Sequence, residues 1–277
     1  MNMILAKNIG FCSGVKRIIH LVETMSKGKK KVYYWGALIH NSVELARLND
    51  IGIKEFDGNV KSGENAIVVT RAHGTSKEEV EMLRKKVKVL DGTCPKVIKI
   101  HQMVDKAIKE GYRVIVYGNE RHAEMKALRK DYENEVKIIS DVNSIEGLTM
   151  SDDEKLLLIS QTTMMKEDFE KIAFALKNKF KNLKVYNTIC EETLARQKEA
   201  IDIAKSVDVV LVIGGKNSSN TNTLVKIAKE YNTRVFHVED EKALFPGMFI
   251  NANTVGVLSG TSTPIYLVKR IIEKCKS

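Results

Sequence analysis

The segment LDGTCPKVIKIH, from Leu90 to His101, places a cysteine at a sharp turn between an apolar run and a run with helical spacing. A single cysteine in such a setting is most simply explained as a small buried hydrophobe. The same setting occurs twice more, in NIGFCSGV around Cys12 and in YNTICEET around Cys190. Three equivalent cysteine turns indicate a shared role.

The rest of the chain repeats with the same period. Short apolar runs alternate with longer amphipathic runs, which predicts an α/β protein with parallel sheets. One class of strand ends in glycine before polar residues, as in VYYWGALIHN, VIVYGNERHAE and VLVIGGKNSSNT. A second class comprises IVVTRAHGTS, LLLISQTTMM and VGVLSGTSTP. Cysteine turn, glycine strand and second strand follow one another three times, which predicts three copies of one small α/β unit.

These copies predict three lobes in a pseudo-threefold, trefoil arrangement. Functional groups of open α/β sheets gather at the carboxyl ends of the strands. Three units around such an axis would bring Cys12, Cys94 and Cys190 to one central point. The first lobe is predicted at residues 13–93, the second at 94–187, and the third at 188–277, completed by residues 1–12.

The composition places the chain among soluble globular proteins. It has 277 residues, 43% hydrophobic and 29% charged, enough for one large domain or two to three small ones. No run approaches the ~18 apolar residues of a membrane span, and the N-terminus does not resemble a signal peptide. We therefore expect a cytoplasmic protein that does not enter a membrane, with cysteines kept reduced.

The formal net charge of +10 predicts an anionic partner. The lysines, however, are spread along helix-like segments such as EEVEMLRKKVKVL. Basic motifs with interleaved aromatic residues, which are typical of nucleic-acid binding, are absent from the sequence. We therefore do not expect a nucleic acid to be the partner.

Three convergent thiolates could hold a zinc ion or an iron–sulfur cluster, or they could be structural. Structural zinc usually takes four protein ligands with close CxxC pairs, which this sequence lacks. A [4Fe–4S] cluster held by three thiolates keeps one iron open to substrate. The fourth cysteine, Cys275, has no equivalent in the repeat and is expected to be inert.

Side chains that can donate hydrogen bonds follow the strands of the repeat. His40, His73 and His122, three of the six histidines, occupy equivalent positions. Imidazoles, hydroxyls and amides near helix N-termini form a cradle for phosphate oxygens, and no Walker A motif points to a nucleotide. In such a pocket Glu124 would be the best available proton donor. The further cradle candidates are Thr162, Ser218, Ser219, Asn220 and Ser262.

The order and spacing of nine motifs carry a resemblance over nearly the whole chain. They are GFCSGV, ALIHN, RAHG, DGTCPKV, HAE, QTT, TIC followed by ARQ, SSNT and SGTSTP. With them the chain resembles the 4-hydroxy-3-methylbut-2-enyl diphosphate reductases, the IspH or LytB family. The resemblance implies a three-lobed α/β fold around a [4Fe–4S] cluster held by Cys12, Cys94 and Cys190. It also implies reductive removal of an allylic hydroxyl, giving isopentenyl and dimethylallyl diphosphates in the last step of the non-mevalonate (MEP) isoprenoid pathway.

The resemblance also implies roles for single residues. Glu124, His122 and Thr162 would be catalytic, with Thr162 and Glu124 near the substrate hydroxyl and Glu124 delivering protons. Electrons would come from ferredoxin or flavodoxin, and we expect the chain to act as a monomer. The residues implied to bind the diphosphate are His40, His73, His122, Ser218, Ser219, Asn220 and Ser262.

The chain departs from the family pattern beside these residues. Gly92 stands where the family usually has alanine, and Arg121, Ala123 and Ala127 stand where it usually has glycine, proline and glycine. A cation at Arg121 is expected to lower the pKa of the nearby Glu124. Two alternatives remain: a paralogue that reduces a related allylic substrate, and an electron-transfer protein with the same cluster. The donor-rich cradle disfavours the second, since electron transfer needs no anion pocket.

Overall fold

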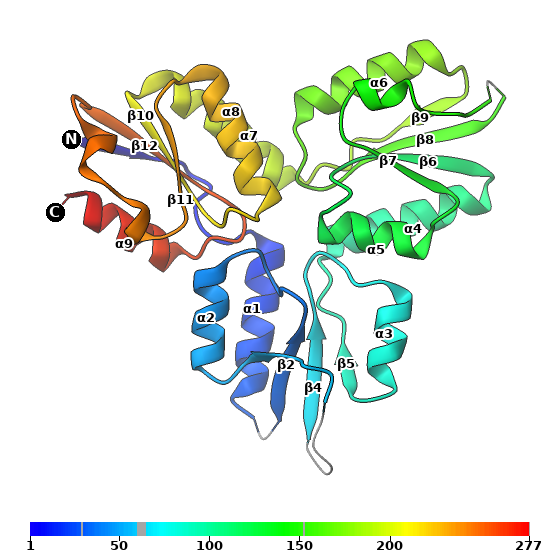
Figure 1. The fold of residues 1–277 in the computed structure, drawn as a ribbon, viewed down its shortest axis with the longest axis horizontal. Helices are drawn as coiled ribbons and strands as arrows, with labels where there is room; N and C mark the ends of the chain where they lie inside the picture. The colour runs from blue at the N-terminus through cyan, green and yellow to red at the C-terminus, as the bar shows by residue number, and fades with distance from the viewer. Residues whose placement is uncertain (29, 60–64, 152, 277) are drawn as a thin grey trace. The chain divides into compact units, whose positions relative to one another are not determined.

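A computed structural model describes residues 1–28, 30–59, 65–151 and 153–276. Most strands are followed by a helix along the chain (Figure 1). The helices are α1 (Ser13–Ser26), α2 (Ser42–Asp50), α3 (Lys77–Arg84), α4 (Pro95–Lys109), α5 (Ala123–Asp131), α6 (Lys166–Lys179), α7 (Glu191–Ser206), α8 (Ser219–Tyr231) and α9 (Ile265–Lys276). The strands are β1 (Asn2–Leu5), β2 (Lys31–Trp35), β3 (Lys54–Glu55), β4 (Ala66–Thr70), β5 (Lys88–Leu90), β6 (Tyr112–Tyr117), β7 (Val136–Ile139), β8 (Lys155–Ser160), β9 (Leu183–Val185), β10 (Val209–Ile213), β11 (Val235–Val238) and β12 (Thr254–Ser259). Short 3-10 helices are η1 (Asn143–Ile145), η2 (Glu241–Ala243) and η3 (Pro246–Phe249).

The strands form three four-stranded sheets with one repeated order. The orders are β3-β2-β4-β5, β7-β6-β8-β9 and β11-β10-β12-β1. In each sheet the central parallel pair joins a glycine-ended strand to a strand of the second class: β2 to β4, β6 to β8 and β10 to β12. The strand before each cysteine turn then pairs with the second-class strand. The predicted α/β class with three similar small units is confirmed.

The central strands are apolar because the sheets are covered. All residues of β4 and of β10 are buried. Strands of parallel sheets that are packed on both faces read as continuous runs of Val, Ile and Leu, without the alternation of a half-exposed strand. The runs AIVVT and VVLVI therefore follow directly from the parallel topology.

The contacts divide the chain into two compact units. Unit 1 comprises Met1–Gly28, Ala37–Glu55 and Glu191–Ser277, and unit 2 comprises Lys29–Gly36 and Phe56–Cys190. The three lobe boundaries proposed from the sequence stay a prediction.

In unit 1 the sheet β11-β10-β12-β1 carries helices on opposite faces. Val255 and Val257 of β12 pack in one core with Leu267 and Ile271 of α9. Successive strand residues point to opposite faces, so Gly256 faces the other way. A Cβ atom at Gly256 would lie 2.2 Å from Ile203 Cγ2 of α7, so this glycine lets α7 lie close against the strand.

In unit 2 the sheet β7-β6-β8-β9 is also covered on both faces (Figure 1). Val114 and Val116 of β6 pack with Val104 of α4 and with Met125 and Leu128 of α5 in one core. Helix α6 lies on the opposite face in Figure 1. This packing fixes where α4 and α5 begin, at the carboxyl edge of the sheet.

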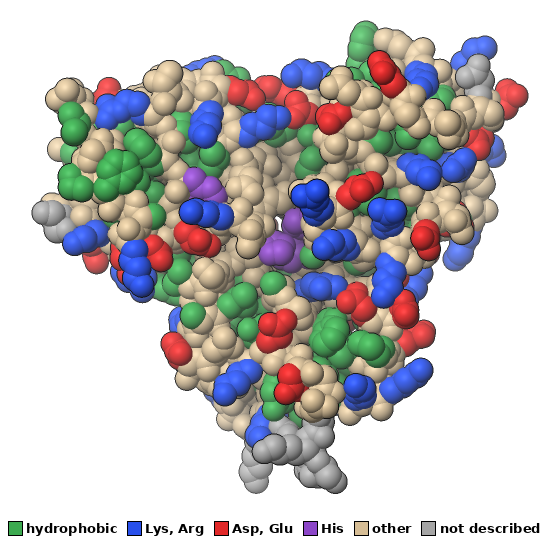
Figure 2. Space-filling view, in the orientation of Figure 1, with side chains coloured by type: hydrophobic (Ala, Val, Ile, Leu, Met, Phe, Trp, Pro, Cys, Tyr) green, Lys and Arg blue, Asp and Glu red, His purple; other side chains and the backbone are tan. Residues whose placement is uncertain are grey.

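Among the residues that the structure describes, no helix combines the length and the apolar character needed to cross a bilayer. On the face drawn in Figure 2, Lys and Arg side chains are interspersed with Asp and Glu. The positive net charge is therefore not gathered into one basic patch on that face.

Candidate functional site

The three predicted cysteine ligands occupy equivalent positions at helix starts. Cys12 is the N-cap of α1, Cys94 is the N-cap of α4, and Cys190 directly precedes α7. The backbone N–H of each donates to a carbonyl oxygen two residues beyond the end of a second-class strand. The three pairs are Cys12 N to Thr261 O at 3.0 Å, Cys94 N to Ala72 O at 2.9 Å and Cys190 N to Thr162 O at 3.0 Å. The repeat therefore extends to the hydrogen bonds that hold each cysteine.

Glu124 lies in the first turn of α5 in unit 2 and is only 2% exposed. Thr162 Oγ1 donates to Glu124 Oε2 at 2.7 Å, and the Thr162 N–H donates to Glu124 Oε1 at 3.0 Å. Burial raises the pKa of Glu124 to about 7, although the two bonds from Thr162 act in the opposite direction. The carboxyl group can thus hold a proton near neutral pH and release it, as general acid catalysis requires.

Arg121 does not act on this carboxyl group as the sequence led us to expect. Its side chain is exposed, and its backbone N–H donates to Asn119 Oδ1 at 2.9 Å. The pKa of Glu124 is raised by burial, and Arg121 is not among the groups that shift it. The expectation that Arg121 lowers this pKa is wrong, because desolvation of a buried carboxylate outweighs a solvent-screened cation.

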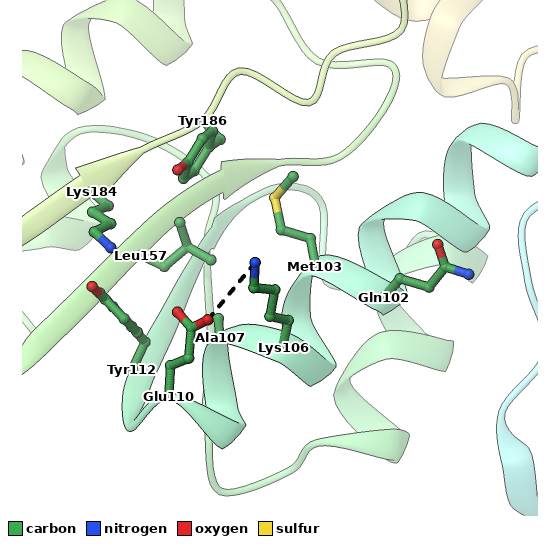
Figure 3. A pocket seen from close by; sticks show the side chains of 9 residues that line it. All are labelled: Gln102, Met103, Lys106, Ala107, Glu110, Tyr112, Leu157, Lys184 and Tyr186. Carbon is green, nitrogen blue, oxygen red and sulfur yellow. Dashed lines mark ion pairs between the residues drawn. The ribbon is translucent and has the colours of Figure 1, made fainter.

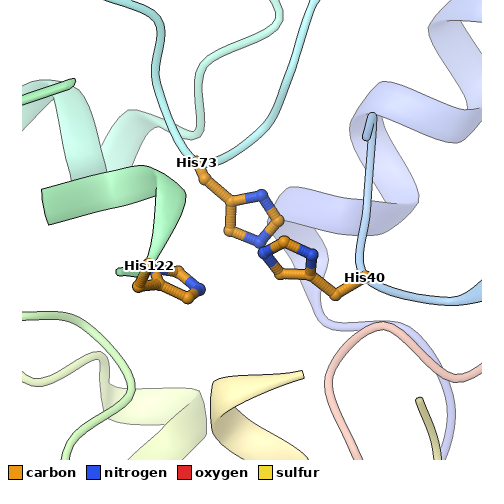
Figure 4. A group of neighbouring side chains, drawn as sticks. All are labelled: His40, His73 and His122. Carbon is orange, nitrogen blue, oxygen red and sulfur yellow. The ribbon is translucent and has the colours of Figure 1, made fainter. Parts of the chain in front are cut away.

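His122 is the N-cap of α5 and lies beside His73. The Glu124 N–H donates to His122 Nδ1 at 3.3 Å, which places the ring proton of the neutral imidazole on Nε2. The His73 and His122 rings meet edge to face, with centroids 5.2 Å apart (Figure 4). Unit 2 thus brings together two of the three predicted phosphate-binding histidines.

Cys94 and Cys190 share this neighbourhood with Glu124. The pKa of the Cys94 thiol is raised, first by burial and then by the nearby charges of Cys190 and Glu124, while the N–H groups of Lys96 and Val97 lower it. None of the four cysteines forms a disulfide, and all four are half-buried. Thiolate sulfur is a soft ligand, and it suits the irons of an iron–sulfur cluster better than it suits a hard cation. The donor set therefore fits an iron–sulfur cluster.

In unit 1 Thr261 forms hydrogen bonds both to the start of α8 and to the turn before α1. Asn220 Oδ1 accepts from the Thr261 N–H at 2.9 Å, and Thr261 O accepts from the Cys12 N–H. Asn220 Nδ2 is buried and has no hydrogen-bond partner among the described residues. Ser218 caps α8 by accepting from the Thr221 N–H at 3.3 Å. Helix N-termini with such donors attract phosphate groups.

His40 also belongs to unit 1 and lies against the glycines that follow β10. A Cβ atom at Gly215 would be 2.5 Å from the His40 carbonyl oxygen, so only glycine allows this approach. The next residue, Asn41, caps α2 by accepting from the Glu44 N–H at 2.9 Å. His40 is thereby placed beside the loop that leads to Ser218.

The predicted site residues fall into two sets, one in each unit. Unit 1 holds Cys12, His40, Ser218, Ser219, Asn220 and Ser262. Unit 2 holds His73, Cys94, His122, Glu124, Thr162 and Cys190. Cys275, the cysteine that we expect to be inert, lies in α9 against the core of unit 1, where burial raises the pKa of its thiol.

Gln161 supports the site although the sequence does not predict a role for it. Gln161 is fully buried: its Oε1 accepts from the Asn119 N–H at 2.9 Å, and its Nε2 donates to Thr163 Oγ1 at 2.9 Å. It thereby ties the loop before His122 to the loop that carries Thr162. Its place in the QTT motif was a usable signal.

A surface pocket of unit 2 contains none of the predicted site residues (Figure 3). It is lined by the second half of α4, with Lys106 Nζ 3.8 Å from Glu110 Oε1, and by Tyr112 and Lys184. Tyr112 is the first residue of β6, so the pocket lies toward the amino end of that strand. The histidines and Glu124 follow carboxyl ends, where α/β proteins build their sites.

The sequence matches a family model described as "LytB protein" over residues 3–276. A 4-hydroxy-3-methylbut-2-enyl diphosphate reductase of Helicobacter hepaticus is 37% identical over 280 residues, covering 99% of this chain and 98% of the relative. The enzyme of the same name from Campylobacter hominis is 36% identical over 276 residues, with the same coverage.

Solved structures are similar over the whole chain. The E-1-hydroxy-2-methyl-but-2-enyl-4-diphosphate reductase of Plasmodium falciparum superposes with a TM-score of 0.92 at 29% identity, covering 100% of this chain and 88% of the other. A second structure has a TM-score of 0.70 at 34% identity, covering 100% and 99%. It is described as (E)-4-hydroxy-3-methyl-but-2-enyl diphosphate reductase, the terminal enzyme of the non-mevalonate pathway.

Proposed function

Because the chain belongs to the LytB family, we propose that the two residue sets described above carry out the reductase reaction of that family in this protein. The enzyme is an iron–sulfur oxidoreductase that converts 4-hydroxy-3-methylbut-2-enyl diphosphate to isopentenyl and dimethylallyl diphosphates. It acts last in the non-mevalonate pathway of isoprenoid biosynthesis. The observation that carries the assignment of residues is the buried Glu124–Thr162 pair beside two cysteines.

The overall reaction replaces an allylic hydroxyl group by hydrogen. It consumes two electrons and two protons, breaks the C–O bond, and releases water. Cys12, Cys94 and Cys190 would hold a [4Fe–4S] cluster, which would supply single electrons and a Lewis-acidic iron when bound. Three cysteines that form no disulfide and lie at equivalent helix starts support this ligand set.

Binding of the diphosphate is assigned to donors at helix N-termini and to the histidines. Asn220 Nδ2 offers a buried donor, and Ser218 begins α8. His122 presents its Nε2 proton because its Nδ1 already accepts from Glu124 N–H. Charge-assisted bonds from such groups hold the phosphate oxygens and orient the far end of the substrate. We assign the same role to His40, His73, Ser219 and Ser262.

Glu124 is assigned as the proton source for the departing hydroxyl group. Because its pKa is raised to about 7, the carboxyl group is protonated in a substantial fraction of the protein molecules at neutral pH. Thr162 Oγ1, 2.7 Å from Glu124 Oε2, can accept this proton while donating its own to the substrate oxygen. Protonation makes the leaving group water instead of hydroxide, and the second proton goes to the allylic carbon framework.

The remaining assignments concern the setting of the enzyme. We propose ferredoxin or flavodoxin as the electron donor, because the reaction needs electrons one at a time. We further propose that the chain works as a monomer in the cytoplasm, where its thiols stay reduced.

The reaction is tested with protein purified without oxygen. We expect about four iron and four sulfide ions per chain, as a [4Fe–4S] cluster requires. With dithionite and a viologen dye as reductant, 4-hydroxy-3-methylbut-2-enyl diphosphate should give both isoprenyl diphosphates, separated by chromatography. A fully loaded protein that reduces a different allylic diphosphate but not this one would overturn the substrate assignment.

A further inference from the structure

Side chains on one face of α7 form hydrogen bonds to the segment that surrounds Cys12. Glu192, Arg196 and Glu199 are spaced by four and three residues, so they lie on the same side of the helix. Their hydrogen-bond partners include Asn8, Gly10 and Ser13, in the segment that leads from β1 into α1. The ARQ motif supplies Arg196, and the reaction described above leaves that residue without a role.

Arg196 is the central residue of this face. It is 4% exposed and uses both ends of its guanidinium group. Nη1 donates to Asn8 O at 2.5 Å and to Ser259 O at 2.8 Å, and Nη2 donates to Gly10 O at 2.7 Å. The Ser259 hydroxyl in turn accepts from the Gly10 N–H at 3.0 Å. One side chain therefore joins the loop before Cys12 to the end of β12.

Glu199 and Glu192 form hydrogen bonds to the segment before and after Cys12. Glu199 accepts from the Asn8 N–H at 3.0 Å and from Asn8 Nδ2 at 2.9 Å. Glu192 accepts from the Ser13 N–H at 3.1 Å and also bonds the Ser13 hydroxyl. Cys12 thus lies between two positions that are fixed to the same helix.

Arg196 bonds residues that lie close to Cys12 on two sides: Ser259, near the hydrogen-bond partner of Cys12, and Gly10, two residues before Cys12. The Cys12 N–H donates to Thr261 O, and Thr261 follows Ser259 by two residues. Gly10 precedes Cys12 by two residues and adopts a φ of 90°, a turn that regular secondary structure does not stabilise. Gly10 is buried, so its carbonyl oxygen needs a hydrogen-bond partner inside the protein, and the planar guanidinium of Arg196 donates to it and to Asn8 O at the same time.

We propose that Arg196 is a positioning residue that, with Glu192 and Glu199, presets the Cys12 turn for cluster binding. The proposal rests on the assignment of Cys12 as a cluster ligand. Groups that orient a metal ligand without touching the metal commonly change metal affinity by roughly 10–100-fold when they are removed. We expect the forked shape of the guanidinium group to matter more than its charge, because the single ammonium group of a lysine cannot donate to Asn8, Gly10 and Ser259 together.

The test compares anaerobic holoenzyme of the wild type with Arg196→Lys and Glu192→Gln. Lys198→Met is the matched control, since Lys198 is an exposed cation on the same helix. Hydrogen–deuterium exchange is measured for peptides covering residues 8–13, and iron release is timed in excess chelator. We expect Arg196→Lys to speed exchange in that segment and iron release by roughly 10–100-fold. Glu192→Gln should change both in the same direction but less, and Lys198→Met should match the wild type.

A spectroscopic signature separates positioning from general stability. We expect the electron paramagnetic resonance spectrum of the reduced cluster to change in Arg196→Lys while exchange in β10 and α9 stays at the wild-type level. Wild-type exchange at residues 8–13 in Arg196→Lys would overturn the proposal. If that variant does not fold, Glu192→Gln decides alone, and wild-type exchange and iron release in it would overturn the proposal.

The ligand assignment is tested by a separate variant. Cys12→Ser with its full iron content would refute Cys12 as a ligand, whatever the exchange of residues 8–13 shows. Loss of iron from Cys12→Ser together with wild-type exchange in Arg196→Lys would leave the proposed function intact and reject only the role of Arg196.

Discussion

At the scale of single residues, the burial of Glu124 decides what its carboxyl group can do. Glu124→Gln keeps the shape and one hydrogen bond to Thr162 but has no proton to transfer. We expect substrate to bind and to perturb the cluster spectrum, while turnover falls by roughly 10²–10⁴-fold. Substrate titration followed by absorbance, together with a steady-state assay, measures both. Loss of binding along with turnover would indicate a structural role instead.

The pH dependence follows from the raised pKa of about 7. The active form is the protonated acid, so turnover should decline as pH rises through 7, and Glu124→Gln should lack this decline. The folded protein holds a proton that the unfolded chain loses near its ordinary value of 4.5, so the contribution of Glu124 to stability falls between about pH 4.5 and 7. A turnover profile that is flat from pH 6 to 8.5 would contradict the assignment.

At the scale of elements, the N-cap of α8 combines a structural and a binding role. Ser218→Ala removes the bond to the Thr221 N–H and should cost about 1 kcal/mol of unfolding free energy. Because the same helix start is assigned to the diphosphate, affinity for the product diphosphates should also fall. Ser76→Ala is the matched control, since Ser76 caps α3 in a capping box and has no assigned ligand. Equal loss of stability in both, with unchanged affinity in both, would reject α8 as part of the cradle.

The start of α5 depends on a close approach at Gly118. A Cβ atom there would lie 2.6 Å from Met125 Sδ and 3.0 Å from Met125 Cγ, so Gly118→Ala should force this fully buried side chain of α5 to repack. Overpacking of this kind costs about 1–3 kcal/mol. We also expect turnover to fall, because α5 carries His122 and Glu124. Gly147→Ala, where the nearest neighbour outside the adjacent residues is 3.9 Å away, should leave denaturant unfolding and turnover unchanged.

At the scale of the whole molecule, three cysteines from distant parts of the chain are assigned to one cluster. Cys12→Ser, Cys94→Ser and Cys190→Ser should each lose the cluster or all turnover, whereas Cys275→Ser should retain both. Iron and sulfide analysis with an activity assay checks all four variants. An active, fully loaded Cys94→Ser would refute the ligand set, because Cys94 shares its neighbourhood with Cys190 and Glu124.

The sequence by itself determined the repeat and therefore the sheets. Glycine-ended strands, second-class strands and cysteine turns recur in order, and each sheet pairs them in that order. Hydrophobic periodicity and turn residues are local properties, so a chain that repeats them three times repeats the supersecondary unit. The family resemblance, carried by ordered motifs, was confirmed by relatives 36–37% identical over 99% of the chain.

Only the tertiary structure decided the chemistry of the charged groups. Arg121 is three residues from Glu124 in sequence, yet it does not set the pKa of that carboxyl group. Thr162, 38 residues away, donates both hydrogen bonds, and burial raises the pKa. Arg196 likewise bonds Asn8 across 188 residues. Desolvation and hydrogen bonding depend on which atoms meet in the folded chain, and sequence spacing does not record that.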